Sequence, residues 1–496
     1  MPIADWGDHD ATALAALVRS GAASPKELVD IALDAIDAVN PRLNAVVHRM
    51  DDSARTAAEG TLPDGPFRGV PMVVKDLDGF TAGVPYTMSC RFLEGFIPEH
   101  DAEVIARLRR AGFLLLAKTN CPELGILGTT EPVLRGATRN PWSLAHSPGG
   151  SSGGSAALVS ARAVPVGHGG DGGGSIRIPA SACGLFGLKT SRGLLPLGPD
   201  IGEGWGGYVV PGVLTRSVRD SAAIYEALRG SSTGDPYHGP VLEGPLTADL
   251  ERPPERLRVA VCPTSLFGRG TDPECAAGLE NTVALLRDLG HDVEEARPAF
   301  DRDALVFAYL VQVAASVALE VEDAGRWMGK TPTPSGFEPA TWFLRQLGDQ
   351  LSAADLQRSR DHVHVAGRSL GAFFRTYDVM LTPTMAYPVV KLGETALKPV
   401  ERVGLSVLRT VPIKPVMMKL LRDLADQSLE RVPNTQLFNM TGLPAMSVPL
   451  HTTQNGLPIG MQFAAGFGRD GLLLRLGAQL ERAKPWIGRK PGVCAT

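Results

Sequence analysis

The sequence predicts an α/β protein in which helices cover a sheet, and three observations lead to this prediction. Residues 102–120, AEVIARLRRAGFLLLAKTN, have the pattern of a helix that stops at Gly112 and a strand that follows it. Residues 68–77, RGVPMVVKDL, are a short apolar run with a charged end, which predicts a buried strand that carries Lys75 to a sheet edge. Glycine (56) and proline (39) are both above average usage, which favours a loop-rich α/β fold over a helical bundle.

The other elements follow in chain order. Residues 10–60 are expected to be helical, with Ser24 as an N-cap, Pro25 at the first helical position and Glu27 at the capping-box position. Further along we expect helices at 214–230 and 273–290, strands at 256–262, 378–388 and 443–450, a turn-rich connection at 231–256, and mostly helix over 300–430. Residues 139–195 are rich in glycine and serine, but apolar runs flank the glycines, so we expect packed core there and not a linker.

Composition and charge argue against several classes of protein. The 496 residues include 49 basic and 53 acidic side chains with a net charge of -4, so no pervasive basic face indicates nucleic-acid binding. Six cysteines without a C-x-x-C pair indicate reduced thiols, and the N-terminus lacks the basic region of a signal peptide, so we expect a cytoplasmic protein. The apolar run 304–319 is interrupted by Gln312 and is too short to span a bilayer, which predicts a buried helix and no stable membrane insertion.

Two known motifs match the glycine-rich stretches but fail in their context. The run GHGGDG at 167–172 fits the spacing of a dinucleotide-binding fingerprint, but Pro179 would break the required helix and no acidic residue follows about 20 positions later. The run GGSSG at 149–153 fits a nucleophile elbow, but no later histidine has a recognisable triad context. His362 and His364 would face different ways on a helix, so we expect no metal site and no cofactor.

A third interpretation combines Lys75 with two serines. One serine lies in SPGGSSGGS and another in GDGGGSIR. A serine needs a base to become a nucleophile, and a lysine can be that base only when neutral, a form that burial away from acids favours. Asp76 follows Lys75 directly, yet neighbours on a strand point to opposite faces, so Asp76 need not pair with it.

These segments resemble the amidase signature family, whose hydrolases use a Ser–cis-Ser–Lys triad. The matching runs lie in order over most of the chain: GVPMVVKDL, LLAKTNCPELG, ATRNPWSLAHSPGGSSGGSAALVSARAVPVGHGGDGGGSIRIPASACGLFGLKTSRG, SVRDSA, DVMLTPT, NMTGLPAMSVPL and GLPIGMQFAA. The long central run is highly specific for the family. The resemblance implies Lys75 as the base, Ser151 as the serine preceded by a cis peptide bond, and Ser175 as the nucleophile.

The resemblance implies further site residues. The oxyanion hole would consist of the backbone N–H groups of Gly172, Gly173, Gly174 and Ser175. Candidate substrate contacts are Cys121, Gly149, Gly150 and Arg177. For Arg177 we favour an ion pair with Asp171 that holds the loop. The chain has glycine at 170 and 172 where the family commonly reads T-D-T-G-G-S, which we interpret as a roomier site.

The family implies an α/β/α sandwich around a large mixed sheet, as a single domain over residues 1–496. Its signature core is expected at 65–230 and 375–485, with N-terminal helices at 1–60 and a variable helical cap over 231–430. Within the cap, the Met- and Leu-rich segment 397–430 is interpreted in three ways: as a mobile lid over an apolar pocket, an amphipathic helix that covers the core, or a membrane-surface helix.

The implied reaction is hydrolysis of an amide C–N bond through an acyl-enzyme on Ser175. The runs TTEPVLRGATRNPW and HGGDGGGSIRIPAS are most similar to the branch that contains hydrolases of 6-aminohexanoate (nylon) oligomers. Aryl acylamidase and carbamate (urethane) hydrolase activities are the alternatives, and the glycines at 170 and 172 disfavour an amidase subunit of a transamidation complex. We expect a small-molecule amide or carbamate as the ligand, and the oligomeric state, a homodimer included, stays open.

Overall fold

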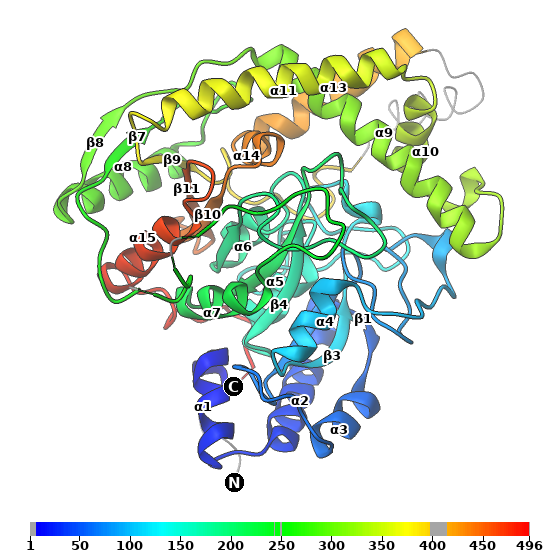
Figure 1. Ribbon diagram of the computed structural model, residues 1–496, viewed down its shortest axis with the longest axis vertical. Coiled ribbons are helices and arrows are strands. Elements are labelled where there is room, and N and C mark those ends of the chain that lie inside the picture. Colours follow the sequence, from blue (N-terminus) through cyan, green and yellow to red (C-terminus); the bar gives the residue numbers. More distant parts are fainter. Residues whose placement is uncertain (1–5, 243, 249, 397–413, 496) are drawn as a thin grey trace.

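The centre of the molecule is a large mixed sheet of 11 strands with flanking helices (Figure 1). The computed structural model describes residues 6–242, 244–248, 250–396 and 414–495. The strand order is β1-β3-β2-β4-β6-β5-β10-β11-β9-β7-β8. The strands are β1 (Val46–Arg49), β2 (Pro71–Lys75), β3 (Leu114–Thr119), β4 (Val166–Asp171), β5 (Phe186–Lys189), β6 (Val210–Thr215), β7 (Arg258–Val261), β8 (Asp292–Glu295), β9 (Val379–Pro383), β10 (Ala445–Thr452) and β11 (Pro458–Ala465).

Helices flank this sheet and form a second group away from it. The α-helices are α1 (Ala11–Ser20), α2 (Pro25–Leu43), α3 (Asp51–Glu59), α4 (Glu103–Arg110), α5 (Gly153–Ser160), α6 (Arg177–Cys183), α7 (Val218–Leu228), α8 (Pro273–Asp288), α9 (Arg302–Met328), α10 (Pro339–Gly348), α11 (Ala353–Phe373), α13 (Lys414–Arg431), α14 (Gln436–Thr441) and α15 (Asp470–Ala483). Helices α9, α10, α11 and α13 lie along one side of the molecule, and α1 to α3 lie at the opposite end (Figure 1).

The parallel register at the centre of the sheet positions the site. Strand β2 runs parallel to both β3 and β4, so the carboxyl ends of these strands point the same way. Met72 pairs with Val166 and Val73 with Gly167. Lys75 is the last residue of β2, and β4 continues to Asp171, where the segment that carries Ser175 begins.

Local signals predicted several elements correctly. Ser24 caps α2 in a full capping box with Glu27, and Pro25 is the first helical residue, as expected. Gly112 follows α4 with φ +98°, and a Cβ there would lie 2.5 Å from the Arg68 backbone. Only glycine fits both the backbone conformation and the space, which explains why the helix stops before β3.

Other expectations were wrong in part. The region 1–60 is not only helical, because β1 lies within it and pairs with β3. The region 231–430 is not only a helical cap. The strands expected at 256–262 and 378–388 are present as β7 and β9, and β8, which was not expected, joins the same sheet. The segment 397–413 lies outside the described residues, so the lid interpretation is not tested.

The apolar run expected at 304–319 is part of a longer helix. Helix α9 has 27 residues and is long and apolar enough, by length and composition alone, to cross a membrane. However, 56% of its most apolar window is buried inside the protein, as in the core helix of a globular fold. The expectation of a buried helix therefore holds for this part of α9. The expectation that the apolar segment is too short to span a bilayer was wrong.

Candidate active site

The end of β2 brings Lys75 to Ser151. Every residue of β2 is buried, and Lys75 itself is 1% exposed. Its Nζ donates a hydrogen bond to Ser151 Oγ at 2.9 Å and lies 2.8 Å from Asp78 Oδ2. The structure therefore joins two of the residues that the sequence placed in one site, and adds a carboxylate that the sequence analysis did not include.

The serine loop before α5 contains the predicted cis peptide bond, between Gly150 and Ser151. Gly149 has φ +79°, and a Cβ on Gly150 would lie 2.7 Å from the Thr129 carbonyl oxygen. The Thr130 hydroxyl donates to the Gly149 carbonyl at 2.8 Å. Packing thus accounts for both glycines, and their contact with a substrate stays a prediction.

Ser175 lies in the loop between β4 and α6, next to the first serine loop. The Ser152 N–H donates to the Ser175 carbonyl at 3.3 Å, so the two serine segments run side by side. Ser175 and Gly173 are partly exposed, whereas Ser151 is 2% exposed. Of the two predicted catalytic serines, Ser175 is therefore the one that a ligand can reach more easily.

A fully buried ion pair supports the loop between β4 and α6, residues 172–176, which we call the glycine loop. Arg177 Nη2 lies 2.8 Å from Asp171 Oδ1 and Arg177 Nε lies 3.0 Å from Asp171 Oδ2, and both side chains are 0% exposed. The remaining guanidinium N–H groups donate to Thr435 O, Gln462 Oε1 and Asn439 Oδ1. All five donors of the guanidinium thus have acceptors. Arg177 is not free to bind a substrate, which corrects that candidate and confirms the favoured pairing with Asp171.

The carboxyl group of Asp171 is held ionised inside the protein. Burial raises its pKa, but the charge of Arg177 and hydrogen bonds from Arg177 and Asn439 outweigh burial and lower the pKa to about 2. Asp171 Oδ1 also accepts the Gly174 N–H at 2.8 Å. The loop that carries Ser175 is therefore anchored by a permanent buried charge.

The backbone donors of the loop are not equivalent. The Gly174 N–H, one of the expected oxyanion donors, is already donated to Asp171. In the part of the chain that the structure describes, no acceptor is bonded to the N–H groups of Gly172, Gly173 or Ser175. Consecutive unpaired amides at a glycine turn form a concave donor site that suits an anion.

The glycines at 170 and 172 do not make a roomier site, so that interpretation was wrong. A Cβ on Gly170 would overlap the carboxylate of Asp78. A Cβ on Gly172 would lie 3.0 Å from Val209 and 3.2 Å from the Trp205 ring. The space that each glycine leaves is already filled by a side chain from another segment.

Aromatic side chains that the sequence analysis missed surround this loop. A Cβ on Gly173 would overlap the Tyr309 hydroxyl, which comes from α9. The Tyr309 ring stacks on Tyr208 with 6.1 Å between centroids. Trp205, against Gly172, donates its Nε1–H to Glu320 Oε1 at 2.9 Å, and Glu320 also lies on α9. No local pattern marks these residues, because α9 is more than 100 positions away in the chain.

Of the two acidic residues that follow Lys75, Asp76 lies as expected and Asp78 does not. Asp76 points away from it, and its buried carboxylate accepts hydrogen bonds from the N–H and hydroxyl of Thr87. Asp78, however, pairs with Lys75, so the lysine is not buried away from acids. Strand alternation ends at Lys75, and Asp78 has a left-handed backbone with φ +63° that turns its side chain back toward the strand end.

Cys121 does not line an accessible surface. It is 0% exposed, its Sγ lies 3.7 Å from Ser89 Oγ, and burial raises the pKa of the thiol to about 12. A fully enclosed neutral thiol cannot contact a ligand without rearrangement, so the prediction of a substrate contact was wrong for the structure as it stands. Among the described residues, no group of three or more His, Cys, Asp or Glu side chains could hold a metal ion.

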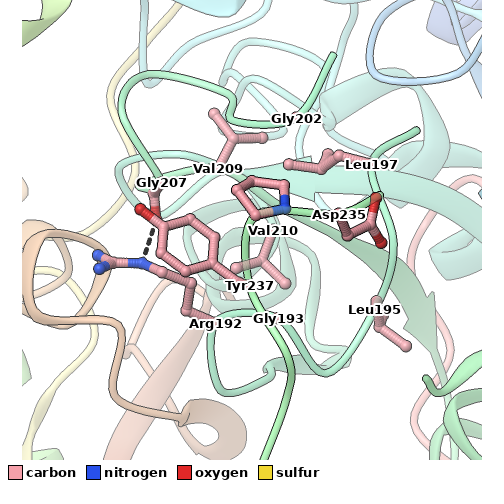
Figure 2. Close-up of a pocket in the computed structure, with 11 residues that line it drawn as sticks. Arg192, Gly193, Leu195, Leu197, Gly202, Gly207, Val209, Val210, Asp235 and Tyr237 are labelled. Carbon is pink, nitrogen blue, oxygen red and sulfur yellow. Dashed lines mark hydrogen bonds between the residues drawn. The ribbon is translucent and has the colours of Figure 1, made fainter. Parts of the chain in front are cut away.

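A small pocket lies among residues between positions 192 and 237 (Figure 2). Its lining is Arg192, Gly193, Leu195, Leu197, Gly202, Gly207, Val209, Val210, Asp235, Pro236 and Tyr237. Val209 and Val210 form a wall shared with the loop, since Val210 pairs with Asp171. Lys75, Ser151 and Ser175 are absent from the lining, so this pocket does not contain the predicted catalytic residues.

The fold and the site define a class of protein. An α/β fold on a mixed sheet, with a lysine bonded to a serine that follows a cis peptide bond, is what the amidase resemblance implied. A model of the family described as Amidase matches residues 27–474. The chain belongs to the amidase signature family, and it is an amidohydrolase that acts on carbon–nitrogen bonds.

The chain is similar to relatives over nearly its full length. It is 38% identical over 490 residues to 6-aminohexanoate-cyclic-dimer hydrolase of Pseudomonas sp. (strain NK87), which covers 97% of this chain and 96% of the relative. The solved structure of a 6-aminohexanoate cyclic dimer hydrolase complexed with substrate is 37% identical, with a TM-score of 0.89 and 99% of each chain covered. A bacterial aryl acylamidase of the amidase signature family is 26% identical, with a TM-score of 0.84, covering 97% of this chain and 99% of that one.

Proposed function

We propose that the protein hydrolyses small secondary amides through an acyl-enzyme on Ser175. Neutral Lys75 takes a proton from Ser151, and Ser151 takes one from Ser175. The Ser175 Oγ then attacks the amide carbonyl carbon. The observation that carries this assignment is the 2.9 Å hydrogen bond from Lys75 Nζ to Ser151 Oγ, beside a partly exposed Ser175.

The loop amides stabilise the charge that develops during attack. The tetrahedral intermediate carries a negative oxygen, and fixed N–H donors in a water-poor site stabilise it more than the neutral carbonyl. We assign this role to the unpaired amides of Gly172, Gly173 and Ser175. The Gly174 amide instead fixes the loop to Asp171.

Proton return completes both half-reactions. Ser151 passes its proton to the leaving nitrogen, because an amine anion is a very poor leaving group. Water then attacks the ester on Ser175 and gives a proton to the same relay, which returns it to Ser175 Oγ as the ester bond breaks. The acid product leaves, and Lys75 is again neutral, so protons balance over the cycle.

The surroundings of the loop support an apolar substrate. Trp205 and Tyr309 border Gly172 and Gly173, and both are partly exposed. Flat aromatic faces favour alkyl chains and planar amide groups. Together with the similarity to 6-aminohexanoate-cyclic-dimer hydrolases, this supports 6-aminohexanoate oligomers, cyclic or linear, as the substrate class.

Two alternatives stay within the same chemistry. The similarity to an aryl acylamidase supports an aryl amide, whose leaving group is an aniline. A carbamate has the same carbonyl geometry and differs in its acyl side. A panel with the 6-aminohexanoate cyclic dimer, an acetanilide and a small urethane, read by mass spectrometry, separates the three.

The catalytic assignment is tested with Ser175→Ala. We expect loss of at least about 1000-fold in turnover with an unchanged melting temperature. Intact-mass spectra should show an acyl adduct on the wild type and none on the variant. A variant that keeps turnover near the wild-type rate would exclude Ser175 as the nucleophile, and a wild type that needs an added protein for turnover would favour a transamidation subunit.

A further inference from the structure

Asp78 occupies a position that the relay just described does not use. Its Oδ2 lies 2.8 Å from Lys75 Nζ, and its side chain is 16% exposed while Lys75 is 1% exposed. A Cβ on Gly170 would overlap this carboxylate, and all three nearest atoms that it would meet belong to Asp78. Gly170 and Asp78, which are 92 positions apart, therefore share one space.

We propose that Asp78 is a positioning residue that holds Lys75 on Ser151. The inference rests on the proposed role of Lys75 as base. A neutral amine has two N–H donors and one lone pair. In the structure Nζ donates to both Asp78 and Ser151. Once the amine is neutral, keeping one N–H on Asp78 lets the lone pair face the Ser151 hydroxyl. Gly170 makes this arrangement possible, because any side chain at 170 would push the carboxylate off the lysine.

Several other titratable groups surround Lys75. Asp76 is bonded to Thr87, Lys118 on β3 to Gly79 O, and Glu320 on α9 to Trp205. Cys121 and Tyr86 are buried, and the ring nitrogens of His168 on β4 have no hydrogen-bond partner among the described residues. Burial lowers the pKa of His168 to about 3 and raises that of Cys121 to about 12, so both are neutral near pH 7. Burial raises the pKa of Glu320 to about 8, so this group titrates in the range of interest and needs its own control.

The test measures the reactivity of Ser175 directly, which removes any dependence on the natural substrate. A fluorophosphonate probe forms a serine O–P bond and expels fluoride, and the serine proton goes to the base. The labelling rate is followed by intact mass from pH 5 to pH 10.

The first comparison is Asp78→Asn, which keeps an oxygen acceptor and removes the charge. We expect the pH profile of labelling to shift, because the group that holds Lys75 loses its charge. The same shift should appear in a Glu320→Gln background. An Asp78→Asn profile that superimposes on the wild-type profile would overturn the proposal.

The second comparison is a double-variant cycle with a matched glycine. Asp78→Ala and Gly170→Ala should each slow labelling about 10-fold or more, and the double variant should be no slower than the slower single variant, since both break one contact. The matched control is Gly172→Ala, whose added methyl group would contact Trp205 and Val209. Its loss of labelling rate and that of Asp78→Ala should multiply in the double variant. If the variants are folded and the rate losses of Asp78→Ala and Gly170→Ala multiply in the double variant, the proposal is overturned.

The two levels of inference fail in different ways. Labelling of Ser175→Ala at the wild-type rate would refute the proposed function. Labelling of the wild type at Ser175 together with an unshifted Asp78→Asn profile would refute only the role of Asp78. Melting temperatures of all variants distinguish loss of reactivity from loss of fold.

Discussion

Two buried ion pairs flank the glycine loop, and they are built differently. The Asp171–Arg177 pair is closed, because both side chains are 0% exposed and each guanidinium N–H has an acceptor inside the protein. The Lys75–Asp78 pair is open. Its carboxylate reaches the surface of the site, and Lys75 also hydrogen-bonds a serine hydroxyl.

The difference suggests a structural role for the Asp171–Arg177 pair and a role in the reaction for the Lys75–Asp78 pair. A saturated buried pair has no free donor or acceptor, so it can only hold the loop in place. A pair that keeps one bond to a hydroxyl can transfer a proton through that bond. We therefore expect damage to the closed pair to appear in stability and damage to the open pair to appear in reactivity.

The largest expected effect is on stability and follows Arg177→Met. The Asp171 carboxylate would stay buried without its partner, so we expect the free energy of unfolding to fall by about 3–5 kcal/mol in urea titrations. The pKa of Asp171 lies at about 2, below its ordinary 3.8, so the wild-type advantage should be complete above pH about 4 and shrink as pH falls toward 2. Lys26→Met, which breaks an exposed pair with Asp30, is the control and should change the free energy by less than about 1 kcal/mol.

The open pair is broken by Lys75→Met. We expect the turnover rate to fall by about 100- to 10,000-fold, because the base is lost. The loss of unfolding free energy should be smaller than for Arg177→Met, since Asp78 keeps contact with solvent. A stability loss as large as that of Arg177→Met would show that the two pairs do not differ in the way described.

A smaller effect is expected for Asn439→Ala, at the edge of the closed pair. Asn439 Nδ2 donates to the backbone oxygen and the carboxylate of Asp171 and to Tyr208 O. Loss of these bonds should lower the unfolding free energy by about 1–3 kcal/mol, because buried groups are left unpaired. Thr441→Val, on the same helix and bonded only to Leu437 O, should have a smaller effect in the same assay.

The smallest effect concerns the pH dependence that Glu320 contributes. Burial raises its pKa to about 8, so the folded protein holds a proton there that the unfolded chain releases above its ordinary pKa of 4.5. Wild-type stability should therefore decline as pH rises from about 4.5 to above 8, and Glu320→Gln should remove this decline. Measured against the wild type, the variant should therefore be relatively more stable at pH 9 than at pH 4. Equal stabilities at both pH values would contradict a buried, protonated Glu320.

Local sequence signals predicted the elements whose cause is local. The capping residues of α2, the glycine stop after α4 and the apolar run of β2 depend on neighbours a few positions away. Strand β8 has no such signal, because its four residues, DVEE, are mostly exposed and charged. It exists because its backbone pairs in parallel with β7, and that pairing cannot be read from its side chains.

The candidate site shows the same division between residues that local signals predict and residues that only packing reveals. Lys75 and Ser151 were predicted from motifs, and the structure places them in contact. Asp78 was missed because alternation along β2 was applied only to Asp76, whereas the chain turns after Lys75. The glycine at position 170 was a signal for Asp78, but its meaning depends on what fills the space beside it.

By itself, the sequence determined the family, the local elements and the residue types available for the reaction, since these depend on short-range patterns and on one long specific run. The tertiary structure alone decided which partner each charged group has. Arg177 reaches acceptors on Thr435, Asn439 and Gln462, all more than 250 positions away. Such contacts depend on how strands and loops pack, and they decide whether a buried charge supports the loop or takes part in the reaction.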